Sequence, residues 1–448
     1  MNMERKRIYL CLAHMSDEGI ELKYIKEAFD TNWVAPLGPN VNGFEKDLEE
    51  FCGENKRVVA LSAGTAAVHL ALIACGVKPG DEVCVQSFTF CASSHPIMYL
   101  GATPVFIDSE KDTWNMDPEL LEEAIKDRIA KTGKKPKAIV PVALYGMPYK
   151  IDRIMEIANK YDIPVVEDAA EGLGSKFNGQ VLGTFGKYGV LSFNGNKIIT
   201  TSGGGALITP DDDSWREIMM YATQYRESYP YYQHEKIGYN YRMSNICAGI
   251  GRGQMTVVND HLAHHKHVQK MYEELLANVL GVHVHSQPNN EFNGLPEFDS
   301  NYWLCTITID ENVKVKGQED AYKTIVTRAV GGAAGVIHAA ESATTDCQPN
   351  DNVEALRIFL DEAGIEARPV WKPMHKQPVY CAPLNEKGEM INEKLPCGVI
   401  CQTSASSVAY VNGVSEEIFK VGMCLPAGRY VSDDDVKYIV ECIKNAIE

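Results

Sequence analysis

Residues 58–65 read Val58-Val59-Ala60-Leu61-Ser62-Ala63-Gly64-Thr65, a short apolar run that ends in a tight turn, and a helical pattern over 66–75 follows directly. The same order recurs along the chain, with apolar runs at 82–86, 103–107, 138–142 and 164–167 and helical patterns at 96–100, 120–131 and 151–160. Strands that are apolar throughout are typical of a mostly parallel sheet covered by helices on both faces. The pattern therefore predicts a doubly wound α/β domain whose ligands bind at the carboxyl ends of the strands.

The flanking segments complete this organisation. They predict helices at 16–30 and 44–52, a loop at 33–42, a strand at 206–209 in the same sheet, a helix at 215–223, a long helix at 245–280, a strand at 303–309, and helices at 353–363 and 433–446. We expect a large domain over 1–255 and a smaller α/β domain over 256–448. Residues 312–352 have the least readable pattern, and we expect a flexible or inserted region there.

Charge and composition exclude several classes of protein. The 448 residues include 43 Lys and Arg against 60 Asp and Glu, a net charge of −17, which opposes non-specific binding of nucleic acid. The 13 cysteines are scattered singly, which indicates reduced thiols in a reducing compartment. Since no apolar run approaches the length of a membrane span, we expect a soluble cytoplasmic protein without a membrane partner.

Two segments carry the most specific chemistry. The buried strand Pro164-Val165-Val166 ends in Glu167-Asp168, and 29 residues after Asp168 the run Ser192-Phe193-Asn194-Gly195-Asn196 ends in Lys197. Pyridoxal phosphate needs such a pair: a lysine amine forms a Schiff base with its aldehyde, and an aspartate keeps its ring nitrogen protonated. Ser192 offers a hydroxyl to the phosphate. The apolar and glycine-rich residues after Lys197 argue against a solvated loop lysine.

Each of the other motifs is ambiguous when taken alone. Gly64 and Thr65 open a helix that could bind an anion, although a simple capped helix explains them as well. Phe90 follows a strand end, where its ring could stack on a pyridine or simply pack in the core. Asp168 could be a helix N-cap instead of a partner for a cation. The order in which these elements occur is more specific than any one of them.

Taken together, the motifs resemble those of the DegT-type nucleotide-sugar aminotransferases. The resemblance is carried by Ala35-Pro36-Leu37-Gly38 and by the runs 62–72, 167–175, 192–205, 237–245, 368–375 and 424–426, so it covers nearly the whole chain. It implies the type I fold of aspartate aminotransferase and a homodimer with shared active sites. It also implies that Lys197 is the Schiff-base lysine and general base and that Asp168 is the partner of the ring nitrogen.

The resemblance assigns further residues to the cofactor and the substrate. It implies that Gly64, Thr65 and Ser192 bind the phosphate, that Phe90 stacks on the ring, and that Asn240 reaches the phosphate of the other subunit. Glu171 departs from the Gln or His of many members. It resembles the subgroup that aminates C4 of UDP-4-keto-6-deoxy-N-acetylglucosamine in bacillosamine synthesis. Four residues are candidates for substrate contacts: Arg226, Arg368, Trp371 and His375.

Four histidines on the long predicted helix could suggest a metal site. His261, His264, His265 and His267 lie on a predicted polar helix and form no metal-ligand pattern with an acidic or cysteine residue. We therefore expect no metal there, and a solvated or interface face instead.

These expectations combine into one predicted reaction. The chain would transfer an amino group, with L-glutamate as donor, to a nucleotide-linked 4-keto-6-deoxy sugar that we expect to be UDP-linked. The alternatives are the same chemistry on another nucleotide sugar, such as a GDP-linked perosamine precursor or a 3-keto sugar, and a non-catalytic regulator with this fold. A nicotinamide-dependent dehydrogenase is disfavoured because residues 62–65 lack the G-x-G-x-x-G fingerprint.

Overall fold

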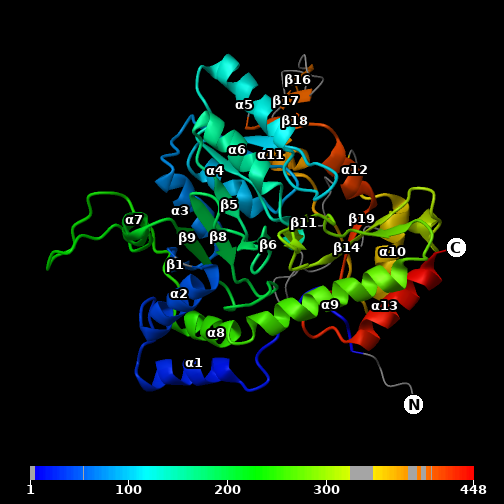
Figure 1. Cartoon of the computed structure of the whole chain (residues 1–448), viewed down its shortest axis with the longest axis horizontal. Helices are drawn as coiled ribbons and strands as arrows, with labels where there is room; N and C mark the ends of the chain where they lie inside the picture. The colour runs from blue at the N-terminus through cyan, green and yellow to red at the C-terminus, as the bar shows by residue number, and fades with distance from the viewer. Residues whose placement is uncertain are drawn as a thin grey trace.

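The computed structural model describes residues 6–53, 55–322, 347–381, 391–394, 400–404 and 406–447. Figure 1 shows a large α/β part and a smaller part that packs around helices α9 (Val258–Leu276), α10 (Asp351–Glu362) and α13 (Asp433–Ala446). Among the described helices, none is both long and apolar enough to cross a membrane.

A mixed central sheet forms the middle of the large part. Its described strands run in the order β16-β17-β18-β3-β2-β4 and then β5-β8-β9-β1, and parallel bridges join β4 to β5. The strands are β1 (Arg57–Leu61), β2 (Glu82–Gln86), β3 (Thr103–Ile107), β4 (Ala138–Val140), β5 (Val166–Asp168), β8 (Tyr188–Ser192), β9 (Gly205–Thr209), β16 (Ile391–Lys394), β17 (Ile400–Thr403) and β18 (Val408–Val411). β18, β3, β2 and β4 are parallel, whereas β9 is antiparallel to both of its neighbours. The predicted α/β class with a mostly parallel core is confirmed.

Helices cover both faces of this sheet. Along β1, Val58 and Ala60 point to one apolar core, and Val59 and Leu61 point to the other, as the alternation of a strand requires. The first core includes α2 (Pro39–Cys52), α5 (Pro118–Thr132), α6 (Ile151–Tyr161) and α8 (Asn245–Met255), and the second includes α3 (Gly64–Ala74), α4 (His95–Tyr99) and α7 (Asp212–Ala222). The sheet is therefore buried on both faces, and only the ends of its strands are accessible to ligands.

The smaller part has its own sheet and core. Strands β10 (Val282–Val284), β14 (Cys305–Ile309), β19 (Gly422–Leu425) and β15 (Arg368–Pro369) pair antiparallel in that order. Val268, Tyr272 and Leu276 of α9 pack in the core of the smaller part, whereas Val258 at the start of α9 packs in the first core of the large part. Helix α9 therefore connects the two cores.

The remaining described elements complete the structure. They are α1 (Ile20–Asp30), α11 (Pro378–Cys381), α12 (Val414–Val421), the 3-10 helices η1 (Cys91–Ser93), η2 (Leu144–Gly146), η3 (Gln318–Asp320) and η4 (Met374–Lys376), and the strands β6 (Lys176–Phe177), β7 (Gln180–Val181), β11 (Glu291–Phe292), β12 (Leu295–Pro296) and β13 (Phe298–Asp299).

Two local predictions were wrong, and one strand was missed. The helix predicted over 245–280 is two helices, α8 and α9, separated at Thr256 and Val257; β-branched residues weaken a helix, and the Thr256 hydroxyl bonds to Gly253 O at 2.6 Å. The loop at 33–42 ends early because α2 begins at Pro39, and proline suits the first turn of a helix. Strand β8 was not predicted at all.

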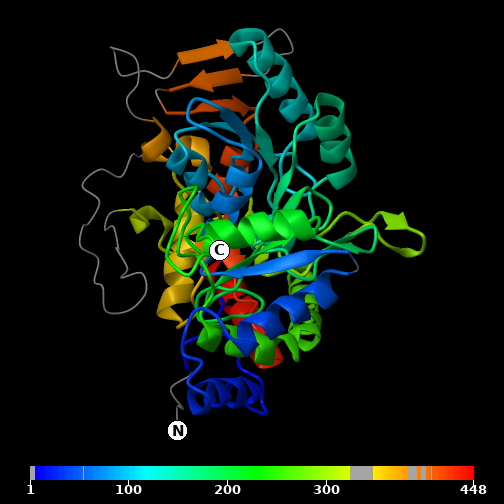
Figure 2. The same cartoon turned by 90° about the vertical axis from the view of Figure 1, so that its left-hand side faces the viewer.

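Both halves of the chain contribute to both parts. β18 pairs parallel with β3 of the large sheet, and Figure 2 shows β16, β17 and β18 (orange) at one edge of that sheet. Conversely, Ile8 near the N-terminus forms a parallel β-bridge with Ile365 and packs in the core of the smaller part. The division at 255/256 stays a prediction. The expectation for 312–352 falls largely on residues 323–346, which lie outside the described residues.

Candidate active site

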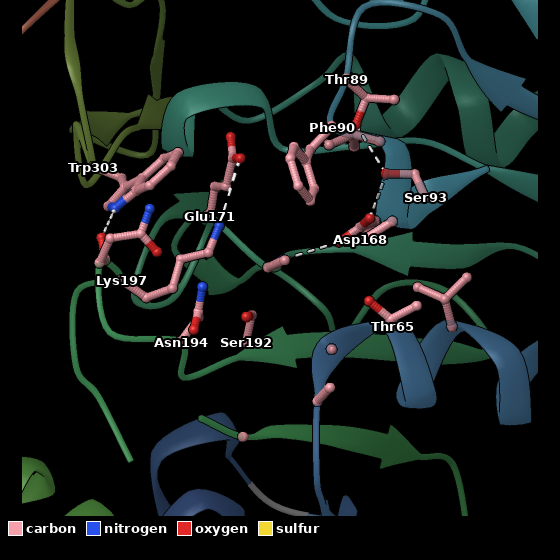
Figure 3. A pocket seen from close by; sticks show the side chains of 18 of the residues that line it. Thr65, Thr89, Phe90, Ser93, Asp168, Glu171, Ser192, Asn194, Lys197 and Trp303 are labelled. Atoms are coloured by element: carbon pink, nitrogen blue, oxygen red, sulfur yellow. Dashed lines mark hydrogen bonds and ion pairs between the residues drawn. The ribbon is translucent and has the colours of Figure 1, made fainter. Parts of the chain in front are cut away.

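A cavity of about 350 Å³ lies at the carboxyl ends of β1, β2, β4, β5 and β8. This is the position expected for ligands of an open α/β sheet. The predicted residues that line it are Gly64, Thr65, Phe90, Asp168, Glu171, Ser192, Lys197 and Trp371. Segments far apart in the sequence therefore meet at one site (Figure 3).

Asp168 is the last residue of β5, and its side chain is 4% exposed. Its Oδ2 accepts a hydrogen bond of 2.6 Å from the hydroxyl of Ser93, and its Oδ1 accepts one of 3.1 Å from the backbone N–H of Ala170. Burial raises the pKa of Asp168, and these two hydrogen bonds only partly oppose the rise. A cationic N–H in the cavity would provide the partner that this buried carboxylate needs.

Lys197 lies on the opposite wall, and Figure 3 shows its side chain pointing into the cavity beside Trp303. Its Nζ is 4.1 Å from the centroid of the Trp303 ring. The indole N–H of Trp303 donates to the backbone O of Asn196 at 2.6 Å, so the ring is fixed against the segment that carries the lysine. The Lys197 side chain is 13% exposed, which excludes most of the water around a free lysine.

Glu171 places a second carboxylate at this site. Its Oε1 lies 3.5 Å from Nζ of Lys197, and its Oε2 accepts a 2.7 Å hydrogen bond from the backbone N–H of Tyr145. Burial raises the pKa of Glu171, while the positive charge of Lys197 opposes the rise. The Tyr145 hydroxyl in turn accepts a 2.7 Å hydrogen bond from the backbone N–H of Trp371.

The N-terminus of α3 faces the cavity through Gly64 and Thr65. Its N-cap, Ala63, has only a methyl side chain, so the first N–H groups of the helix have no side-chain acceptor from the cap. Ser192 lies close by, since a Cβ on Gly64 would lie 3.2 Å from Cβ of Ser192. Gly205 packs against the same turn, where a Cβ would overlap the backbone of Ala63 and Gly64. Such a turn suits a phosphate group.

Two aromatic side chains form another wall. The rings of Phe90 and Trp371 have centroids 5.6 Å apart, and Phe90 is 52% exposed. Phe90 is therefore not a core phenylalanine, and its ring is available to a ligand.

Four residues that were predicted to contact the cofactor or the substrate are not among the residues of this chain that line the cavity. Asn240 and Arg226 are exposed in the segment between α7 and α8, and Arg368 is exposed and paired with Glu366. His375 is buried; its Nδ1 is 2.6 Å from the Ser87 hydroxyl, and its Nε2 is 3.1 Å from Oε1 of Glu416.

The sequence did not single out Ser93, Thr89, Asn194 or Trp303 as site residues. The Ser93 hydroxyl joins Thr89 at 2.8 Å as well as Asp168, and Trp303 packs on Lys197. Serine and threonine after a strand are too common to reveal a role, and Trp303 reaches the site only through the tertiary fold.

The residues present fit pyridoxal phosphate. A buried carboxylate with a raised pKa, an amine on the opposite wall, a helix N-terminus and an aromatic ring surround one cavity. These groups match, in turn, the ring nitrogen, the aldehyde, the phosphate and the ring face of that cofactor.

Comparison with known proteins agrees with this chemistry. Residues 16–334 match the model of the DegT/DnrJ/EryC1/StrS aminotransferase family. EpsN of Bacillus subtilis (strain 168), whose name describes it as a pyridoxal phosphate-dependent aminotransferase, is 40% identical over 98% of this chain and 95% of its own length. GDP-perosamine synthase of Caulobacter vibrioides is 37% identical over 81% of this chain and 84% of its own.

Solved structures of the same family have the same fold. A DegT/DnrJ/EryC1/StrS aminotransferase from Brucella abortus superimposes with a TM-score of 0.74 at 26% identity, covering 96% of this chain and 95% of that one. A sugar aminotransferase from Streptococcus pneumoniae, solved in its pyridoxal phosphate form, gives 0.75 at 22% identity and covers 98% of both chains. The predicted type I fold is confirmed. This chain thus belongs to the DegT/DnrJ/EryC1/StrS family and is a sugar aminotransferase that depends on pyridoxal 5′-phosphate.

Proposed function

We propose that Lys197 bonds covalently to the cofactor, that Asp168 holds its ring nitrogen protonated, and that the enzyme aminates C4 of a UDP-linked 4-keto-6-deoxy sugar. The observation that carries the first two roles is one cavity with the amine of Lys197 and the buried carboxylate of Asp168 among its lining groups. The reaction itself, transamination of a nucleotide sugar, follows from the family.

The other lining groups have matching roles in this proposal. Gly64, Thr65 and Ser192 bind the phosphate at the start of α3, and Phe90 covers one face of the ring. When bound, the cofactor would supply an electron sink for the electron pair that stays on the α-carbon of the amino donor when its α-proton is removed. Lys197 would carry a proton from the donor's α-carbon to the cofactor in the first half-reaction and from the cofactor to the sugar carbon in the second, while Trp303 and Glu171 keep its amine beside the reacting atoms.

Glu171 supports the choice of a UDP-linked 4-keto sugar. It lines the cavity next to Lys197, and a carboxylate at this position resembles the subgroup that makes the bacillosamine precursor. A second candidate is a GDP-linked 4-keto-6-deoxy sugar, because a GDP-perosamine synthase is 37% identical over 81% of this chain. Both substrates use the same chemistry at C4.

We also propose a homodimer with shared sites. The segment between α7 and α8 projects from the large part (Figure 1, left). It exposes Tyr229, Tyr231, Tyr232 and Ile237, whose side chains are 52%, 62%, 79% and 85% exposed. Such a projecting apolar segment would be covered by a second copy, and Asn240 at its end would then reach the partner's phosphate site.

A panel of keto sugars tests the substrate. The purified enzyme, loaded with cofactor, is incubated with L-glutamate and either the UDP-linked or the GDP-linked 4-keto-6-deoxy sugar, and the amino sugar is measured by mass spectrometry. We expect turnover of the UDP-linked sugar at least about 100-fold above the GDP-linked one, since a mismatched nucleotide leaves buried polar groups unpaired. Preference for the GDP-linked sugar would replace this proposal with the second candidate. Replacing L-glutamate by other amino acids in the same assay tests the donor.

A further inference from the structure

Two histidines of α9 are buried beside the segments that carry Lys197 and Trp303. His261 and His265 are 3% and 2% exposed, and their spacing of four residues places them on one face of the helix. The solvated or interface face expected from the sequence is wrong for these two. The physical reason is that α9 passes between the two cores at this point, with Val258 in one core and Val268 in the other.

Each of these histidines bonds to a backbone carbonyl of another segment. Nδ1 of His261 lies 3.0 Å from the O of Ile198, and Nδ1 of His265 lies 3.1 Å from the O of Tyr302. A carbonyl can only accept, so both Nδ1 atoms carry a proton and donate. Burial lowers the pKa of His261, and it lowers that of His265 to about 3, so burial favours the neutral form of both rings.

The two carbonyls adjoin the two residues that meet in the active site. Ile198 follows Lys197, and Tyr302 precedes Trp303, whose ring centroid is 4.1 Å from Nζ of Lys197. The indole N–H of Trp303 also bonds to the O of Asn196, on the other side of Lys197. Hydrogen bonds therefore connect helix α9, the segment that carries Lys197 and the segment that carries Trp303 to one another.

The tryptophan segment needs such a support. Tyr302 has φ of 49°, in the left-handed region that a tyrosine rarely adopts. Backbone strain of this kind persists only where the surroundings hold it. The bond from His265 is one of the contacts that hold it, and Gln287 N–H donates to the Tyr302 hydroxyl at 3.2 Å as another.

We propose that His261 and His265 are positioning residues for transamination, which fix the Lys197 amine against the Trp303 ring by holding both segments to α9. Neither histidine lines the cavity. They act through the backbone of their neighbours, and they connect Lys197 in the large part to Trp303 at the entry of the smaller sheet. This inference rests on the proposed role of Lys197.

The test compares substitutions that keep or remove the donated hydrogen bond. His261→Leu and His265→Leu remove it, whereas His261→Asn and His265→Asn keep an N–H donor at about the place of Nδ1. In the full-length holoenzyme we measure the single-turnover rate with L-glutamate, the cofactor dissociation constant and the absorption spectrum of the bound cofactor. We expect each Leu variant to react about 10- to 100-fold more slowly, with a shifted absorption band, and each Asn variant to stay within about 3-fold of the parent.

A control on the same helix separates this effect from a general change in α9. His267 is exposed and pairs with Asp433 at 2.9 Å, so His267→Leu should leave the rate and the spectrum at parent values. If the Leu variants do not fold, His265→Gln takes their place: its amide reaches one bond too far, so it should lose rate while His265→Asn keeps it. Equal rates for Leu or Gln variants and the parent, or equal losses for Asn and Leu variants, would overturn the proposal.

The parent enzyme distinguishes this inference from the proposed function. If the parent cofactor is not attached to Lys197, the proposed role of Lys197 fails whatever the histidine variants do. If the cofactor is attached there and the histidine variants match the parent, only the positioning role fails.

Discussion

The Nζ of Lys197 lies 3.5 Å from Oε1 of Glu171, in a site where the two side chains are 13% and 5% exposed. Such a pair is costly to break, because removing one partner leaves the other charge buried. It also places a second titratable group next to the amine that we propose to be catalytic.

A double-mutant cycle in the cofactor-free protein tests this pair. Lys197→Met should destabilise the protein more in the parent than in Glu171→Gln, with a coupling of about 0.5–3 kcal/mol measured by chemical denaturation. Burial raises the pKa of Glu171 above its ordinary value of 4.5, and loss of Lys197 removes the charge that opposes this rise. The stability of Lys197→Met should therefore fall as the pH rises above about 4.5. Additive effects at pH 8 would contradict the coupling.

Asp168→Asn should stabilise the cofactor-free protein at neutral pH while abolishing transamination. Burial raises the pKa of Asp168 above its ordinary value of 3.8, so the folded state retains a proton that the unfolded chain releases as the pH rises. Stability of the parent is therefore lost with rising pH above about 3.8, and the variant escapes this loss. We expect a gain of about 1–3 kcal/mol at pH 8 and little at pH 4, measured by denaturant unfolding. A variant less stable than the parent at pH 8 would show that Asp168 is already fully compensated.

Ser93→Ala should weaken the function of Asp168. The Ser93 hydroxyl donates a 2.6 Å hydrogen bond to Asp168, and its loss raises the pKa of that carboxyl further. We expect the single-turnover rate with L-glutamate to fall about 10-fold, since a hydrogen bond to a charged group contributes about 1.5–3 kcal/mol. The matched control is Ser94→Ala, whose equally buried hydroxyl donates to the O of Cys91 and accepts from the Tyr380 hydroxyl, with no bond to Asp168. Equal effects of the two substitutions would argue against a specific role of Ser93.

Gly205→Ala should disrupt the turn at the start of α3. The added methyl group would overlap the backbone of Ala63 and Gly64, which cannot move aside as a flexible side chain can. We expect a loss of about 1–3 kcal/mol in unfolding free energy, together with weaker cofactor binding. The control for stability is Gly203→Ala, because a Cβ there would have no protein atom within 4 Å. Parent-like stability of Gly205→Ala would contradict the close approach of β9 to this turn.

Much of the large domain could be predicted from the sequence. Strands β2 and β3 have the predicted bounds, because each is a short run that contains β-branched apolar residues and stands between clear turn signals. Strand β8 was missed, since Gly189 weakens its strand pattern and is required only because Gly183 packs against it in the fold. The break between α8 and α9 was also missed, because no proline marks it and the glycines that precede it lie inside α8.

The site divides in a similar way. Lys197, Asp168 and Ser192 belong to local motifs whose chemistry can be read along the chain, and all three line the cavity. Trp303 and Ser93 have no such motif, because their roles arise only when distant segments pack together. His261 and His265 were misjudged as surface residues because a helix between two cores is buried on more than one side.

Chemical trapping tests the central claim most directly. The cofactor-loaded enzyme is reduced with borohydride, digested and analysed by mass spectrometry, with Lys197→Ala as the control. We predict that the peptide containing Lys197 alone gains the mass of the reduced cofactor, and that the variant gains none. Attachment to another lysine, or a loaded parent with no attachment, would contradict the account.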